Sequence, residues 1–205
     1  MKRNQIKIVF LGPDGCGKTT LIEYAKQQIE EQGRSVDIFS LGWKRFENPL
    51  LRLISKIYLK SSLKKRKQET EKYRLDRFHE RSWFFYFLYY FELLDRYRKI
   101  KKSRKDFILI DRYFYEELMF IKAFKFKIFT KLTPRPDLCF VLKCPLNIIK
   151  KRGHDASQET LDNFYNHLEK LSKIFPMIFI DSSKSVDKAY KEVERYLNLN
   201  KKFKK

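Results

Sequence analysis

One short segment near the N-terminus constrains the fold of this 205-residue chain more than any other feature. Residues 12–19 read Gly-Pro-Asp-Gly-Cys-Gly-Lys-Thr and match the pattern G-x-x-x-x-G-K-[ST] in full. An apolar, strand-like run at residues 6–11 precedes the segment, and an amphipathic helical pattern at residues 19–32 follows it. In this setting the glycines let the backbone curl so that successive N–H groups point inward at an anion. The helix N-terminus adds partial positive charge, so the pattern predicts a phosphate-binding loop.

Polar side chains of the loop suit a nucleoside triphosphate and its metal ion. The Lys18 ammonium can reach the β- and γ-phosphates, and the Thr19 hydroxyl can ligate Mg²⁺. Thr20 extends the contacts to the α-phosphate, whereas Cys16 fills a small position and is given no chemistry of its own. The alternative is a glycine-rich turn with a chance lysine, which the full match between a strand and a helix disfavours.

The rest of the chain alternates short apolar runs with longer helical patterns. Further strands are expected at residues 36–41, 107–110, 137–142 and 177–180. Helical patterns begin at Asn48-Pro49 and span residues 71–102, 160–174 and 186–197, while the charged residues 61–70 are expected to be exposed. This alternation predicts a three-layer α/β fold with a five-stranded parallel sheet flanked by helices. We expect a single domain over residues 1–205, with ligands bound beyond the carboxyl ends of the strands.

A second candidate for catalysis follows the strand expected at residues 107–110. Asp111 stands at the end of this strand, where its carboxylate can hold Mg²⁺ directly or through water. It can also accept a proton from an attacking hydroxyl. The neighbouring Arg112 supplies a planar, permanently charged fork for a phosphate. Taken without the phosphate loop, the two residues could be an ordinary strand end followed by a surface arginine. Together with the phosphate loop, a role in catalysis is favoured.

The charge of the chain is strongly positive. Lys and Arg number 46 against 25 Asp and Glu, which gives a net charge of +21. Such a balance indicates an anionic partner, either a nucleotide, a nucleic acid or an acidic membrane surface. The basic residues are scattered, and no nucleic-acid-binding motif accompanies them. A solvated basic surface is therefore favoured over a nucleic-acid groove.

Other features limit the class of protein. The three cysteines, Cys16, Cys139 and Cys144, have no paired spacing, which argues against a disulfide scaffold or a zinc knuckle. The N-terminal residues lead straight into a strand-like run, so no signal peptide is expected. The densest apolar window, residues 83–91, is far shorter than the roughly 20 residues of a membrane span. We therefore expect a cytoplasmic protein without a membrane span.

Several segments together resemble the thymidylate kinase family of P-loop nucleotide kinases, as a diverged member. They follow the order and spacing of the family, and the Gly-Pro-Asp-Gly opening of the loop is among the more specific ones. The resemblance implies a P-loop NTPase fold and an enzyme that transfers the γ-phosphoryl of ATP to the 5′-phosphate of dTMP with Mg²⁺. The matching segments are residues 10–21, 110–113, 135–138, 145–152 and 175–183.

The resemblance also implies roles for individual residues. Asp14 would contact the acceptor sugar, Asp111 would assist Mg²⁺ and the acceptor, and Arg112 would bind the acceptor phosphate. A short basic lid near residues 150–160 would supply a cation from Lys150, Lys151 or Arg152, of which we favour Arg152. A solvated basic helix end is an equally weighted alternative for this cluster. Catalysis is thus assigned to Lys18, Asp111, Arg112 and Arg152, and the metal to Thr19 and Asp111. The cofactor-binding set is Gly12, Asp14, Gly15, Cys16, Gly17, Lys18, Thr19, Thr20 and Arg152.

The acceptor half of the chain departs from the family pattern. Residues 41–49 stand in place of the Arg-Glu-Pro-Gly-Gly segment of the family. Tyr90 occupies the position of a family arginine that contacts the thymine base. Met119-Phe120-Ile121 occupies a stretch that in the family contains a base-contacting glutamine. The acceptor is therefore expected to be a small molecule, a nucleoside monophosphate with dTMP first, but without strict thymine selection. The alternatives are the same chemistry on a sugar, lipid-linked or polynucleotide hydroxyl, and a nucleotide-binding regulatory protein without turnover. Members of the family often dimerise through helices, so the resemblance also allows a homodimer.

Two further motifs have competing interpretations. Glu80-Arg81-Ser82 resembles a signature of deoxynucleoside kinases, but its charged, helical surroundings indicate a chance match. The aromatic run at residues 83–91 is interpreted mainly as core, with one or two rings touching the acceptor.

Overall fold

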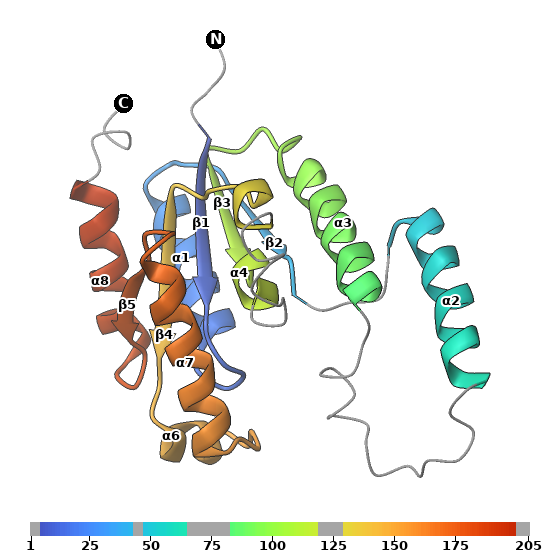
Figure 1. Cartoon of the computed structure of the whole chain (residues 1–205). Coiled ribbons are helices and arrows are strands. Elements are labelled where there is room, and N and C mark those ends of the chain that lie inside the picture. The colour runs from blue at the N-terminus through green and yellow to red at the C-terminus, as the bar shows by residue number, and fades with distance from the viewer. Residues whose placement is uncertain (1–4, 43–46, 65–82, 119–128, 200–205) are drawn as a thin grey trace. The chain divides into compact units, whose positions relative to one another are not determined.

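The computed structural model describes residues 5–42, 47–64, 83–118 and 129–199 (Figure 1). The chain forms two compact units. Unit 1 comprises residues 1–42, 103–116 and 133–205, and unit 2 comprises residues 43–102 and 117–132. The single domain expected over residues 1–205 stays a prediction.

Unit 1 contains a five-stranded, fully parallel sheet in the order β2-β3-β1-β4-β5. The register pairs Phe10 of β1 with Asp111 of β3, so the segment after β1 and the end of β3 lie at the same edge. All five predicted strands are confirmed, with ends that differ from the expected ones by at most one residue. The strands are β1 (Ile6–Leu11), β2 (Val36–Ser40), β3 (Phe107–Asp111), β4 (Leu138–Lys143) and β5 (Ile178–Asp181).

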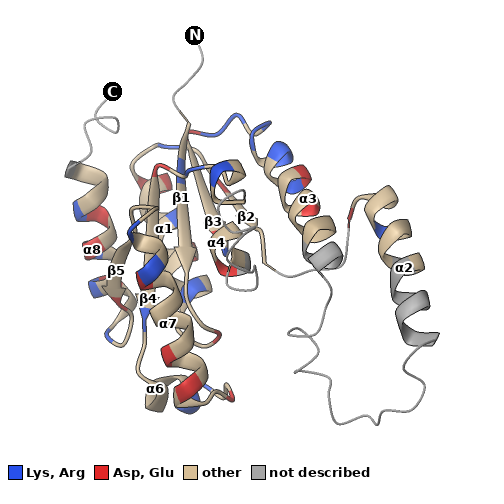
Figure 2. Ribbon diagram, in the orientation of Figure 1, with Lys and Arg blue, Asp and Glu red and all other residues tan. Residues whose placement is uncertain are grey.

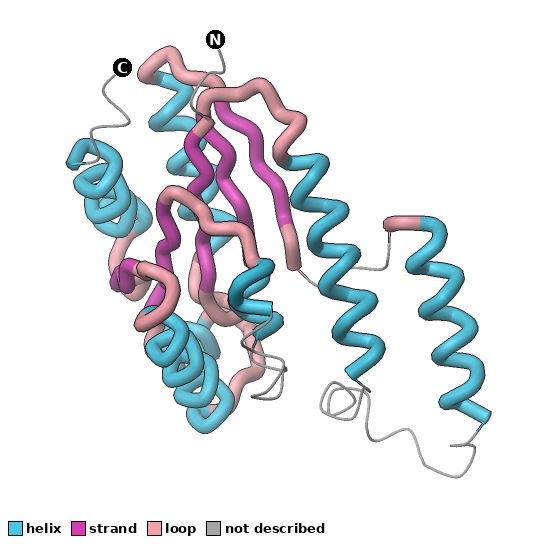
Figure 3. Tube along the Cα trace, turned by 45° about the horizontal axis from the view of Figure 1, so that its top comes forward, coloured by secondary structure: helices cyan, strands magenta, loops and turns pink. Residues whose placement is uncertain are grey.

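Helices cover both faces of this sheet, which confirms the α/β fold (Figures 1 and 3). Helices α1 (Lys18–Glu31) and α8 (Val186–Leu199) share one apolar core with the central strands. In that core the rings of Phe10 and Phe140 stack with centroids 5.7 Å apart. α7 (Gln158–Ser172) lies in front of the sheet in Figure 1 and α1 behind it. The buried strands thus read as nearly continuous apolar runs because water reaches neither face.

α7 begins two residues earlier than the expected residue 160, and its capping residue explains the difference. Ser157 has an extended backbone, and its Oγ accepts a hydrogen bond of 3.1 Å from the N–H of Thr160. A serine at this position satisfies one of the four N–H groups that the first turn leaves without helical partners. The helix can therefore start directly after Ser157.

Ser157→Ala is expected to destabilise unit 1 by about 1 kcal/mol, because the Thr160 N–H loses its acceptor. Thermal unfolding should show a drop in Tm of roughly 2–4 °C for a chain of this size. Ser172→Ala is the matched control, since Ser172 only donates to the Glu169 carbonyl inside the same helix. Equal Tm values for the two variants would contradict the capping role.

Unit 2 is helical in the residues that the structure describes. α2 (Pro49–Lys64) follows Asn48, whose Oδ1 accepts from the N–H groups of Leu50 and Leu51. It packs against α3 (Trp83–Ile100). The helix expected at residues 71–102 is thus found from residue 83 to 100, and residues 71–82, with the Glu80-Arg81-Ser82 motif, lie outside the described residues. Of the charged stretch 61–70, residues 61–64 belong to α2 and the rest is outside too.

The aromatic run of α3 is divided between core and surface. Leu88, Tyr89 and Tyr90 are buried, as a core helix requires. Phe87 and Phe91 are 39% and 44% exposed and meet edge to face at 4.7 Å. Only part of the run therefore serves as core. Within the described part of the chain, no helix combines the length and the apolar character that crossing a bilayer requires.

The positive charge is distributed over many elements. Figure 2 shows Lys and Arg interleaved with Asp and Glu along α3, α7 and α8. Several of these charges are paired on one helix, for example Lys191 with Asp187 at 3.0 Å. This arrangement fits a solvated surface.

Candidate active site

The loop between β1 and α1 has the backbone that its glycines allow. Gly15 and Gly17 have φ values of 81° and 94°, in the left-handed region where a Cβ atom is strained. Gly17 precedes the first residue of α1 and accepts a backbone hydrogen bond from Leu21 at 3.0 Å. The loop therefore leads directly into α1, and the N-terminus of that helix lies at the edge of the sheet.

A cavity of about 480 Å³ lies at this edge, entirely within unit 1. It is lined by most of the residues that the sequence singles out, so the structure brings the predicted groups together. Their roles stay predictions. Among the predicted residues, the lining includes Asp14, Gly15, Cys16, Gly17, Lys18, Thr19, Thr20, Asp111, Arg112 and Arg152, whereas Gly12 is not part of it.

Lys18 is the buried cation of the loop, with only 7% of its surface exposed. Its Nζ donates to the carbonyl oxygens of Gly12 at 2.7 Å and Pro13 at 2.9 Å. It also lies 4.0 Å from Oδ1 of Asp14. These oxygens hold the ammonium within the loop, where a phosphate oxygen could replace a carbonyl as its partner.

Asp111 has an open coordination position. Its Oδ1 is buried and has no hydrogen-bond partner among the described residues. Such an atom is costly unless a cation or a water satisfies it. Thr19 lines the same cavity, and hydroxyl and carboxylate oxygens are ligands that Mg²⁺ prefers. Thr19 and Asp111 would therefore suit a magnesium ion, which would supply positive charge beside the loop.

Arg112 is held between two carboxylates. Nη1 donates to Oε2 of Glu116 at 3.0 Å, and Nη2 donates to Oδ1 of Asp14. Burial lowers the pKa of Arg112, but the charges of Glu116 and Asp14 outweigh it and raise the pKa overall. The guanidinium is thus permanently charged at the mouth of the cavity, where it can meet an anion.

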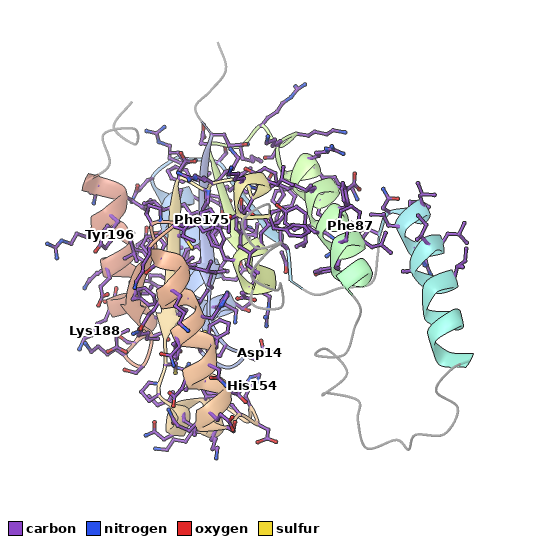
Figure 4. The ribbon with its side chains drawn as sticks, viewed as in Figure 1. Asp14, Phe87, His154, Phe175, Lys188 and Tyr196 are labelled. Carbon is purple, nitrogen blue, oxygen red and sulfur yellow. The ribbon has the colours of Figure 1, made fainter. Side chains whose placement is uncertain are left out.

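The predicted lid touches the loop. Arg152 follows α6 (Leu146–Lys151) and donates from Nη1 to the carbonyl of Gly15 at 2.8 Å. His154 packs on the same glycine, because a Cβ built at Gly15 would lie 2.7 Å from Cδ2 of His154. Figure 4 labels Asp14 and His154 at this end of unit 1. Of the three basic lid residues, Arg152 lines the cavity, while Lys150 and Lys151 are exposed and do not.

The cysteines near the cavity are not activated. Cys16 is buried, and this burial raises the pKa of its thiol to about 11. All three cysteines are free. Cys16 is therefore a neutral thiol at ordinary pH, in agreement with a purely structural position in the loop.

Sequence reasoning missed several residues of the site. Glu116 and His154 contact the loop or its arginine, and the turn between β5 and α8 closes the far end of the cavity. Glu116 had a sequence signal, because it stands four residues after Arg112 in a helical segment. In this region the cavity is lined by Ser182 and Lys184 of the β5–α8 turn and by Val186 and Ala189 of α8.

The positions expected to replace thymine contacts are described only in part. Tyr90 belongs to α3 of unit 2, is 3% exposed, and donates from its hydroxyl to the carbonyl of Phe129 at 3.3 Å. Met119-Phe120-Ile121 and residues 43–46 lie outside the described residues. Tyr90 is thus explained as core of unit 2.

Comparison with known proteins establishes the fold class. A solved thymidylate kinase from Candida albicans, described as having broad substrate specificity and a novel structural element, matches 97% of this chain and 93% of its own. The TM-score is 0.63 and the identity 16%. Neither the family models nor the curated protein sequences give a match. The chain therefore has a thymidylate kinase-like P-loop NTPase fold.

Proposed function

We propose that the chain is a Mg²⁺-dependent phosphotransferase that moves the γ-phosphoryl group of ATP to a small acceptor, a nucleoside monophosphate. One observation carries the proposal: a buried loop lysine, an unpartnered carboxylate oxygen and a paired arginine converge on a single cavity. These groups are Lys18, Asp111 and Arg112. Phosphoryl transfer needs positioning and charge stabilisation more than covalent chemistry, and these are the groups that supply both.

The residues divide into a donor side and an acceptor side. The loop N–H groups and Lys18 would bind the phosphates of ATP, with Arg152 reaching over the loop from the lid. Magnesium, held by Thr19 and Asp111, would neutralise the phosphate oxygens. Lys18 would exchange its bonds to the loop carbonyls for bonds to the migrating phosphoryl group, whose charge is spread over its oxygens in the transition state.

The acceptor side consists of Asp14, Asp111 and Arg112. Arg112 would hold the anionic group of the acceptor, and Asp14 would contact its sugar. A phosphate acceptor attacks with an ionised oxygen, so no base is needed. For a hydroxyl acceptor, the open Oδ1 of Asp111 is placed to receive the proton, which favours the sugar, lipid-linked or polynucleotide hydroxyl as the second candidate.

dTMP is expected to be a non-exclusive acceptor. The position of the thymine-binding arginine holds Tyr90, whose hydroxyl already donates to Phe129. Sites that hydrogen-bond a base edge discriminate by as much as ~10⁴-fold, whereas burial and stacking discriminate by roughly a hundredfold or less. We therefore expect kcat/KM values for dTMP, dUMP, dCMP and dGMP within about two orders of magnitude of one another. Strict selection of dTMP would show that base contacts come from residues such as Trp43, Arg45, Arg77, Glu80 or Arg81.

A panel of acceptors with γ-labelled ATP tests the proposal, with nucleoside monophosphates, sugars and single-stranded oligonucleotides side by side. Labelled product is expected from at least one nucleotide in the presence of Mg²⁺. No labelled product from any acceptor would contradict the proposal and leave a regulatory nucleotide-binding role. For oligonucleotides, a steep fall of affinity with salt would indicate phosphate contacts and favour the polynucleotide alternative.

A further inference from the structure

Glu116 is a buried carboxylate to which the proposed reaction assigns no role. It lies in α4 (Phe114–Glu117), and its side chain is 10% exposed. Burial raises the pKa of Glu116, and the positive charges of Arg112 and Lys18 oppose that rise. A carboxylate withdrawn from water destabilises a folded chain unless its partners compensate. The partners of Glu116 therefore indicate what the residue does.

The two oxygens of this carboxylate face two parts of the site. Oε2 accepts from Nη1 of Arg112 at 3.0 Å. Oε1 accepts a long hydrogen bond of 3.5 Å from the N–H of Gly12, the first residue of the phosphate loop. One side chain thus connects the acceptor-side arginine with the loop proposed to hold the donor.

Arg112 has an unfavourable backbone that its surroundings must maintain. Its φ of 63° is left-handed, which costs a residue with a side chain about 1–2 kcal/mol. Its N–H donates to the carbonyl of Phe10 at 3.0 Å, and a Cβ built at Gly42 would lie 2.5 Å from Cδ of Arg112. Backbone and stem are therefore fixed by β1 and Gly42, and the guanidinium by Glu116.

The two ends of the arginine fork differ in how easily they exchange partners. Nη2 is bonded to Asp14, whose side chain is 71% exposed, so water can solvate Asp14 once an anion takes its place. Nη1 is bonded to Glu116, which cannot be displaced without leaving a buried charge unpaired. Glu116 is the permanent partner and Asp14 the exchangeable one.

We propose that Glu116 is a positioning residue that holds the guanidinium of Arg112 beside the phosphate loop, so that the Asp14 side of the fork can receive the anionic group of the acceptor. The proposal rests on the proposed function and deepens it, because it implies an acceptor that carries an anion and competes with Asp14. Glu116 itself acts only through Arg112.

Glu116→Gln tests this role, since it keeps the shape of the side chain and removes the charge. The first readout needs no turnover: the rate at which phenylglyoxal modifies Arg112, followed by peptide mass spectrometry. We expect severalfold faster modification in Glu116→Gln than in the wild type, and protection by dTMP, used as a phosphate-bearing probe, in the wild type alone. The control is Glu169→Gln, which removes a surface carboxylate paired with Lys143 at 2.7 Å in the same unit and should behave as the wild type.

The second readout separates positioning from stability. Glu116→Gln should lower kcat/KM for the accepted substrate by up to about a hundredfold, while the KM for ATP and the Tm stay near the wild-type values. A merely structural role would lower the Tm and leave the kinetics of the folded protein unchanged. If Glu116→Gln does not fold, Glu116→Asp is used instead, because it keeps the charge but moves the carboxylate away from Arg112. The same changes in modification rate, kcat/KM and Tm are expected for this variant.

The two proposals fail in different ways. Wild-type modification rates in both Glu116 variants would overturn the positioning role, whatever the turnover. Absence of transfer by the wild type would overturn the proposed function, while faster modification of Arg112 in Glu116→Gln would still support the Glu116–Arg112 pair.

Discussion

Lys18→Ala is expected to lower the rate of phosphoryl transfer by about a thousandfold. The Lys18 ammonium is buried in the loop, where it donates to the carbonyl oxygens of Gly12 and Pro13 and, at 3.9 Å, to Sγ of Cys16. In the proposed reaction, its loss would leave the charge that develops on the migrating phosphoryl group without the cation of the loop. The measurement is kcat with labelled ATP, with the acceptor that the panel identifies.

The matched control for this variant is Lys188→Ala, which removes the same charge from the exposed surface of α8 (Figure 4). Turnover of Lys188→Ala should equal that of the wild type. Near-normal turnover of a folded Lys18→Ala protein, with folding verified by its thermal unfolding, would refute the donor-site assignment.

Asp111→Asn is expected to reduce kcat by about a hundredfold or more and to change the KM for ATP far less. In the proposed reaction the Asp111 carboxylate would orient the metal and the acceptor, so it would contribute mainly in the transition state. Asparagine keeps one oxygen but loses the charge, so half-maximal activity should require a higher Mg²⁺ concentration. Activity is measured as a function of Mg²⁺, ATP and acceptor separately.

The stability of this variant separates a catalytic effect from a folding defect. The buried Oδ1 has no partner in the described part of the chain, so removing its charge should not destabilise unit 1. Asp162→Asn, on the exposed face of α7, is the charge-matched control. An unchanged kcat for Asp111→Asn, or an equal loss in the control, would rule out the proposed role.

The strands of the sheet could be predicted from the sequence because the pattern that indicates each strand lies within the strand itself. The central strands β1, β3 and β4 are short apolar runs that are almost fully buried, and the loop motif identifies the strand that precedes it. The expected start of α7, residue 160, is two residues late because a periodic apolar pattern contains no information on a capping residue that precedes the helix. Ser157 is nevertheless a residue type that favours the capping position.

The parts of the site that belong to sequence motifs could be predicted, whereas the parts that depend on tertiary contacts could not. The loop and Asp111 follow directly from a strand end and a fixed spacing. Glu116 depends on the left-handed backbone of Arg112 and on the approach of the loop, neither of which a sequence pattern contains. His154 joins the site through a tertiary contact with Gly15, from which it is far apart in the sequence.

The most direct test of the proposed chemistry compares the amount of acceptor phosphorylated with the amount of ADP formed. Wild-type protein is incubated with γ-labelled ATP, Mg²⁺ and the accepted nucleotide, and ADP, labelled inorganic phosphate and labelled acceptor are quantified together, with Lys18→Ala as the blank. We predict one phosphorylated acceptor for each ADP formed, with little free phosphate. ADP formation accompanied only by inorganic phosphate, or no consumption of ATP with any acceptor, would contradict the account.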